Sequence, residues 1–252
     1  MRRIRVIPTL LIRNGGLVKG RNFKNHQYVG DPINAVKIFN DKEVDELCII
    51  DISATPNKVA PKTEEIADIV SEAFMPVSYG GGITSLSQVE TLFFNGIEKV
   101  LLNTAAVKTP SLITQIAKQY GNQSVVVSID VKKNWLGKTL MYTECGNNAT
   151  KLNPVEFAKQ CEGLGAGEIL LTNIDKEGTY SGYDQELIKQ LHQSISIPII
   201  INGGAASVSD FKTAISNGAS AVAAGNLFVY QRPHNAVLIS YLSAAEIQQL
   251  YS

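Results

Sequence analysis

The sequence predicts a (β/α)₈ barrel, built from two duplicated half-barrels that together occupy residues 1–252 as a single domain. Three observations support this prediction. Eight short apolar runs follow one another along the chain, amphipathic stretches separate them, and a glycine-rich segment of the first half returns in the second. The length of 252 residues is also close to that of a typical barrel of this class.

The apolar runs predict parallel strands covered on both faces, because most are continuous in Val, Ile and Leu rather than alternating. They lie at residues 5–12, 46–52, 76–79, 99–102, 124–130, 168–172, 197–201 and 219–223. Helical periodicity between them is clearest at residues 64–73, 86–95, 110–119, 154–164, 185–192 and 208–217. A further pair of short strands is expected near residues 134–143, with its turn at Gly137.

The two halves of the chain are related by an offset of 122 residues. At this offset Gly81 and Gly82 match Gly203 and Gly204, and both pairs lead into a segment that begins with Ser and ends with Asn-Gly. A doubly wound open sheet needs no such repeat. Two four-stranded halves that close into a barrel explain the repeat directly, and closure also removes the exposed sheet edges.

Composition limits the classes of partner and cofactor. Lys plus Arg and Asp plus Glu are both 23, so a formal net charge of zero gives no support for a nucleic-acid or acidic-membrane partner. No apolar stretch is long enough for a membrane helix, and the start has no cleavable leader pattern. The three scattered cysteines predict neither disulfides nor a metal site, and no nucleotide motif is present. We expect a cytoplasmic protein without a metal or cofactor.

Each half ends a strand in a glycine cluster that precedes a helix, and donor groups follow at the end of the next strand. Glycine lets backbone N–H groups approach an anion closely, and a helix amino terminus favours negative charge. Two such clusters predict two phosphate sites on opposite rims, whereas tight turns alone are the structural alternative. The residues are Gly81, Gly82, Asn103 and Thr104 in the first half, and Gly203, Gly204, Gly225 and Asn226 in the second.

Ordered motifs over nearly the whole chain resemble the cyclase subunit of imidazole glycerol phosphate synthase. The resemblance implies a barrel whose amino-terminal face binds a glutaminase subunit, and through which ammonia passes to a phosphorylated substrate. The matching segments are GGLVKGRNF at 15–23, DEL at 45–47, GGGI at 80–83, NTAAV at 103–107, VVVSID at 125–130, GAGEILLT at 165–172, DKEGT at 175–179 and SGYD at 181–184.

The resemblance also implies a charged gate for ammonia at the amino-terminal ends of four strands. The gate positions fall on Arg5, Glu46, Lys99 and Glu168, and all four residue types match. The structural alternative is an ion-pair plug, because four charges of both signs near a barrel axis can neutralise one another. The further positions expected to bind substrate are Lys19, Asp51, Thr172 and Gly178.

The family pattern has an acid at the ends of strands one and five, and this sequence keeps one of them. Asp130 is retained, whereas Leu11 takes the place of the other acid. Ring closure with carbon–nitrogen cleavage moves protons on two sides of the substrate, which suits one carboxyl group on each side. Asp51, or Lys19 in a mobile lid, could replace the missing acid, although Asp51 could equally be a structural acceptor and Lys19 a solvated cation.

Smaller departures from the family lie at the same end of the barrel, whereas the gate matches. Glu177 replaces an Asp, Asn202 a small hydroxyl residue, Asn226 a Ser and Leu101 a small residue. We therefore expect a subunit that receives ammonia but serves another acceptor. The resemblance suggests amidination of a sugar in surface-polysaccharide biosynthesis, with a separate amidotransferase. The alternatives are a genuine cyclase of histidine biosynthesis and a noncatalytic subunit that activates the glutaminase.

Overall fold

The computed structural model describes residues 4–251, and across this range eight parallel strands close into a barrel. Each barrel strand pairs with the next one along the chain, and the pairing of β12 with β1 completes the ring. This confirms the predicted (β/α)₈ fold. The barrel strands are β1 Arg5–Arg13, β4 Leu47–Asp51, β5 Val77–Gly80, β6 Lys99–Leu102, β7 Val125–Lys133, β10 Glu168–Asn173, β11 Ile199–Asn202 and β12 Ala221–Ala224.

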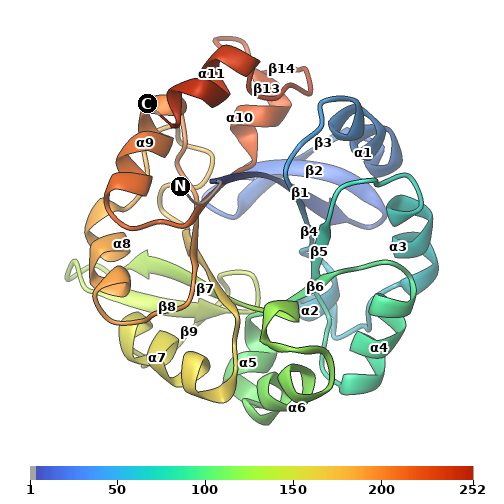
Figure 1. The fold of residues 1–252 in the computed structure, drawn as a ribbon. Helices are drawn as coiled ribbons and strands as arrows, with labels where there is room; N and C mark the ends of the chain where they lie inside the picture. Colours follow the sequence, from blue (N-terminus) through green and yellow to red (C-terminus); the bar gives the residue numbers. More distant parts are fainter. Residues whose placement is uncertain (1–3, 252) are drawn as a thin grey trace.

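Amphipathic helices surround the strands and cover the outer face of the barrel (Figure 1). The outer helices are α1 Pro32–Asp41, α3 Thr63–Val70, α4 Leu86–Phe94, α6 Ser111–Tyr120, α7 Pro154–Leu164, α8 Gln185–His192, α9 Val208–Ser216 and α11 Ala244–Gln249. Three short helices follow barrel strands: α2 Ala54–Asn57 after β4, α5 Thr104–Lys108 after β6 and α10 Asn226–Val229 after β12. The 3₁₀ turn η1 Asn122–Ser124 precedes β7.

The duplication of the sequence is visible in the structure. Helix α4 begins after Ser85 and helix α9 begins after Ser207, which is 122 residues later, and both serines belong to capping boxes. A capping box satisfies N–H groups that the first helical turn leaves unpaired, so it fixes where the helix starts. The two halves therefore place their glycine turns at equivalent points of the barrel rim.

Hairpins extend three of the connections. The pair expected near residues 134–143 is the end of β7 with β8 Thr139–Thr143, which β9 Asn148–Ala149 extends. A second hairpin, β13 Tyr230–Gln231 with β14 Ala236–Val237, follows α10. A third, β2 Gly16–Arg21 with β3 Lys24–Gly30, continues β1 where the sequence predicts a loop. Its polar residues and glycines hide the strand pattern from sequence reasoning.

Candidate active site

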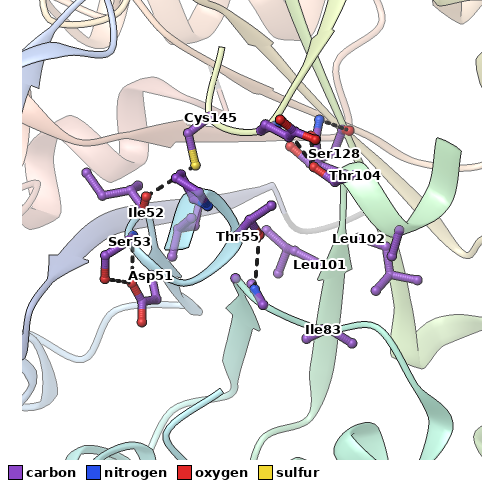
Figure 2. A pocket seen from close by; sticks show the side chains of 18 of the residues that line it. Asp51, Ile52, Ser53, Thr55, Ile83, Leu101, Leu102, Thr104, Ser128 and Cys145 are labelled. Atoms are coloured by element: carbon purple, nitrogen blue, oxygen red, sulfur yellow. Dashed lines mark hydrogen bonds between the residues drawn. The ribbon is translucent and has the colours of Figure 1, made fainter. Parts of the chain in front are cut away.

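A cavity of about 770 Å³ opens at the carboxyl-terminal ends of the barrel strands. Residues from β1, β4, β5, β6, β7, β10 and β11 line it, together with the segments that follow β4 and β5. Figure 2 shows some of the side chains that line the cavity, among them Asp51, Thr55, Leu101 and Thr104. Parallel barrels carry their ligand sites at this end because the βα connections converge there.

Asp130 lines the cavity and is 8% exposed. The Ser128 hydroxyl donates to its Oδ1 at 3.1 Å, and the Asn103 amide donates to its Oδ2 at 3.4 Å. Burial raises the pKa of Asp130 to about 7, although the Ser128 hydrogen bond opposes the rise and Glu177 adds to it. A carboxyl group with a pKa near neutrality can both give and accept a proton.

Leu11 also lines the cavity, from the end of β1. It is half-buried and lies between its register partners, Val18 on β2 and Ile50 on β4. An aliphatic side chain neither donates nor accepts a proton. The cavity therefore has an aliphatic side chain at the one position of β1 where the sequence resemblance implies an acid, between the lining residues Thr9 and Arg13.

Asp51 lies on the cavity at the end of β4, but its side chain organises the loop that follows. Its Oδ1 accepts hydrogen bonds from the Ser53 hydroxyl at 2.6 Å and from the backbone N–H groups of Ser53 and Ala54 at 2.8 and 3.1 Å (Figure 2). These contacts hold the start of α2 and supply the structural role that the sequence left open.

The interpretation of Lys19 as a solvated cation is wrong. Lys19 lies in strand β2, is 1% exposed, and donates from its amine to the backbone carbonyl oxygen of Thr9. Burial lowers the pKa of its amine to about 8, although Glu177 and Cys48 raise it in part. The β-hairpin turns this side chain inward, so Lys19 lies beneath the rim and outside the cavity lining of the described chain.

Glu177 is a cavity residue whose importance sequence reasoning missed. It is 8% exposed, follows β10, and lines the cavity together with Asp130 and the predicted Thr172. Burial raises the pKa of its carboxyl group, and Lys19 lowers it in part. The one available signal was the replacement of an Asp by Glu at this position. Cys145 and His26 also line the cavity, and no sequence pattern predicted either of them.

The two predicted anion-binding turns differ in their access to the cavity. Gly81, Gly82, Asn103 and Thr104 all line it, so the structure brings the first-half residues together. Gly82 donates its N–H to the Thr55 hydroxyl at 3.1 Å. Within residues 4–251, the residues predicted for the second anion-binding turn do not line the cavity, and neither does Gly178. These residues are Gly203, Gly204, Gly225 and Asn226.

The predicted gate residues form one ion-pair network at the amino-terminal ends of their strands. Arg5 reaches Glu46 and Glu168 at 2.6 Å each, and Lys99 reaches the same two carboxylates at 2.9 and 3.1 Å. Burial lowers the pKa of Arg5, but Glu168 and Glu46 outweigh it and raise the value overall. Each cation therefore bridges both anions, and the network spans the bottom of the barrel.

An apolar layer separates the gate from the cavity. Side chains two residues apart in a strand point to the same face, so Ile7, Cys48, Leu101 and Leu170 lie directly above the four gate residues. They form one buried cluster with residues of the neighbouring strands. A path along this axis would therefore admit a small neutral molecule far more readily than an ion.

Comparison with known proteins identifies the family. A model for histidine biosynthesis proteins matches residues 5–234 of the chain. A protein of Pseudomonas aeruginosa, provisionally named as the imidazole glycerol phosphate synthase subunit hisF2, is 47% identical over 242 residues, which are 96% of each chain. The chain belongs to the HisF family of histidine biosynthesis proteins.

Further HisF relatives match nearly full length. A protein of Leptospira interrogans, also provisionally named as this synthase subunit, is 43% identical over 249 residues, or 98% of each chain. The HisF subunit of Pyrobaculum aerophilum is 43% identical over 231 residues, or 90% of each chain. Such coverage extends the HisF likeness over both the cavity and the charged network.

Two negative findings apply to the described part of this HisF-family chain. Between residues 4 and 251, His, Cys, Asp and Glu side chains do not gather in any group of three or more that could hold a metal ion. In the same range, every helix falls short of the length and apolarity needed to span a bilayer.

Proposed function

We propose that this chain is a HisF-like synthase subunit that takes ammonia from a glutaminase partner and delivers it to an acceptor other than the histidine-pathway intermediate. The observation that carries the proposal is Leu11 on the cavity wall, with the charged network complete at the opposite end. With Leu11 in place of an acid, the cavity lacks one of the two groups that transfer protons in ring closure. The complete gate still allows ammonia to enter the barrel.

The barrel axis supports a path for ammonia. The gate of Arg5, Glu46, Lys99 and Glu168 lies at one end, and the apolar layer above it favours the uncharged form of the nucleophile. Rearrangement of one cation would open the gate, while the other cation still contacts both carboxylates. In this proposal the network controls the entry of ammonia in addition to stabilising the bottom of the barrel.

The amino-terminal face carries a second feature that supports a docked partner. Phe74 lies between α3 and β5, and Phe94 ends α4 before β6, so both lie at the same end of the barrel as the gate. Their side chains are 89% and 90% exposed. Large exposed aromatic side chains on one face are typical of protein interfaces, where they supply much of the binding energy.

For the acceptor, the proposal is an N-acyl sugar of surface-polysaccharide biosynthesis. A separate amidotransferase would convert the acyl amide to an amidine, with nitrogen supplied by ammonia and the amide oxygen leaving as water. The barrel would then serve as conduit and binding scaffold. Its cavity retains a carboxyl group, Asp130, and a glycine turn suited to a phosphorylated ligand.

One observation favours a genuine cyclase as the second candidate. Asp130 and Glu177 are both buried on the cavity, and both have raised pKa values. Two such carboxyl groups could share the proton transfers of ring closure. A noncatalytic subunit that activates the glutaminase is the remaining alternative, in which neither carboxyl group affects the output of the complex.

The experiment combines purified protein, an ammonium salt and the bis-phosphorylated intermediate of the histidine pathway. Our proposal predicts no cyclase turnover above background, and robust turnover would reject it in favour of the cyclase. In the complex with the glutaminase subunit, Asp130→Asn should lower formation of the aminated product. Unchanged output would instead support the noncatalytic alternative.

A further inference from the structure

Two buried oxygen atoms in the cavity wall have no hydrogen-bond partner within residues 4–251. They are Thr9 Oγ1 on β1 and Asn202 Oδ1 at the end of β11. Both side chains line the cavity, although Thr9 is 3% and Asn202 is 5% exposed. Buried polar atoms are normally satisfied, because an unmade hydrogen bond leaves the cost of desolvation uncompensated. The two oxygens therefore indicate a ligand that donates hydrogen bonds.

These two side chains lie where the barrel axis leaves the apolar layer and meets the cavity. Thr9 follows Ile7 by two residues in β1, and Asn202 follows Ile200 by two residues in β11, so each pair faces the same side of its strand. Ile7 and Ile200 belong to the buried apolar cluster above the gate. Strand β12 runs between β1 and β11 and contributes alanine side chains to that cluster. It therefore places no bulky side chain between Thr9 and Asn202.

A neighbouring hydroxyl group adds a donor beside the two acceptors. Thr172 on β10 is the register partner of Asn202, and its hydroxyl oxygen accepts a hydrogen bond from the Asn202 amide at 3.4 Å. A hydroxyl group can accept and donate at once, so this contact leaves the Thr172 hydrogen for a ligand. Thr9, Thr172 and Asn202 all line the cavity, and none of them is charged. Together they suit a small neutral molecule that both donates and accepts hydrogen bonds.

The charges around this position favour a neutral ligand over a cation. The buried amine of Lys19 donates to the backbone carbonyl oxygen of Thr9, and with a pKa of about 8 it is still charged at neutral pH. Asp130 and Glu177 line the same cavity, but burial raises the pKa of both carboxyl groups and so favours their uncharged forms. A second cation at Thr9 is therefore repelled by Lys19 and only weakly attracted by the carboxyl groups.

We infer that Thr9 and Asn202 form a binding site for ammonia at the end of its path, where their two unpartnered oxygens accept N–H groups and the Thr172 hydroxyl donates to the nitrogen lone pair. Ammonia has three N–H groups and one lone pair, so it can make all three hydrogen bonds. Asn202, which replaces a small hydroxyl residue of the family pattern, supplies one acceptor and also orients Thr172. The inference rests on the proposed function, which brings ammonia along the axis, and it adds the place where ammonia is held before it meets an acceptor.

The test measures binding of ammonia to the full-length, ¹⁵N-labelled chain by the chemical shifts of the Asn202 side-chain amide and the Thr9 backbone amide. Ammonium chloride is titrated at several pH values below the pKa of ammonium, beside potassium chloride at equal ionic strength. Potassium carries the charge of ammonium without its N–H groups, and its titration removes shifts that arise from protonation of Lys19, Asp130 and Glu177. We expect saturable shifts with ammonium chloride alone. The total ammonium at half-saturation should fall about tenfold for each pH unit, as the fraction of ammonia rises.

Two variants each remove one acceptor at similar volume, after a thermal melt shows that they are folded. Thr9→Val and Asn202→Leu should each weaken ammonia binding about fivefold, as expected for loss of one hydrogen bond. Thr143→Val is the matched control. Thr143 is an equally buried threonine outside the cavity lining of the described chain, and its hydroxyl oxygen already accepts the Asn148 amide at 3.3 Å. This control should leave ammonia binding unchanged, and an equal loss in all three variants would contradict the assignment.

Three outcomes of the titration would overturn the inference. Half-saturation at the same total ammonium at every pH would mean that the cation binds, equal shifts with potassium would mean an effect of salt, and no shift with either salt would mean that water alone occupies the site. All three leave the proposed function intact, because ammonia can cross the cavity without being held there. The proposed function fails separately, by cyclase turnover of the histidine-pathway intermediate, since the binding test contains neither acceptor nor partner.

Discussion

The Ser128 hydroxyl donates a hydrogen bond to Oδ1 of Asp130 at 3.1 Å, and both side chains face the barrel interior from β7. This bond stabilises the charged carboxylate, whereas burial stabilises the neutral acid. Because burial is the larger effect, the pKa of Asp130 rises to about 7. The pair thus controls the protonation of the one acid that the cavity retains from the family pattern.

Replacement of Ser128 should shift this balance. Ser128→Ala removes a donor to the carboxylate, so the pKa of Asp130 should rise above that of the unsubstituted protein. A carboxyl ¹³C titration followed by NMR measures it. Ser78→Ala is the matched control, because Ser78 is buried on another strand and donates to the carbonyl oxygen of Leu47. An unchanged or lower pKa in Ser128→Ala would contradict the account.

The raised pKa of Asp130 also predicts how stability depends on pH. A group with a raised folded-state pKa binds more protons when folded, so its contribution is complete below the ordinary pKa of 3.8 and is lost as pH rises through about 7. Asp130→Asn removes this loss. Relative to the unsubstituted protein, its free energy of unfolding should therefore rise between about pH 4 and about pH 8, by at most about 4 kcal/mol.

Urea unfolding across this pH range gives the comparison. Glu177 contributes a pH dependence of the same direction to both proteins, and because its charge also raises the pKa of Asp130, the difference between the two profiles reports Asp130 together with its interaction with Glu177. Parallel profiles for the two proteins would mean that Asp130 titrates at its ordinary pKa.

The gate network should matter for stability as well as for passage. Glu46→Gln leaves Arg5 and Lys99 with Glu168 as their shared anion, and the Glu46 side chain is 4% exposed. Loss of a charge from a buried network should lower the free energy of unfolding by about 2–4 kcal/mol. Glu72→Gln, which breaks the exposed pair with Lys37, should change it by less than about 0.5 kcal/mol. Equal losses of unfolding free energy in Glu46→Gln and Glu72→Gln would mean that the buried network is worth no more than an exposed ion pair.

Partner binding should depend on the amino-terminal face. Phe74→Ser and Phe94→Ser should each weaken binding of the glutaminase subunit by about tenfold or more, because each removes an exposed aromatic anchor. Isothermal titration calorimetry measures the affinity. Trp135→Ser is the control, since Trp135 is equally exposed at 90% but lies at the opposite end, between β7 and β8. A larger loss of affinity in Trp135→Ser than in Phe74→Ser and Phe94→Ser would mean that the glutaminase subunit binds at the cavity end of the barrel.

Sequence reasoning predicts the features that depend on local pattern. Continuous apolar runs predict the barrel strands, with ends within two residues except at β7, which continues three residues further, to Lys133. The 122-residue repeat predicts the equivalent turns at Gly81 and Gly203, which the structure places at equivalent helix starts. Family resemblance places Glu46 and Glu168 at strand starts, where the structure joins them in one network.

Features that depend on contacts between distant residues escape sequence reasoning. The burial of Lys19 depends on a hairpin whose polar residues do not alternate with apolar ones. The contact of the first hairpin with the end of β12 depends on the hydrogen bond between Gly20 and Asn226, which lie 206 residues apart. The capping role of Asp51 requires the loop geometry of Ser53. In each case the deciding contact lies outside the repeating pattern.

The central claim is that position 11 separates delivery of ammonia from cyclase chemistry. The most direct measurement compares cyclase turnover of the unsubstituted protein, Leu11→Asp and Leu11→Asn with ammonium salt and the bis-phosphorylated histidine-pathway intermediate, after a thermal melt shows that each is folded. We predict turnover in Leu11→Asp alone, about 10²-fold or more above the other two. Turnover of the unsubstituted protein at the level of Leu11→Asp would contradict the account.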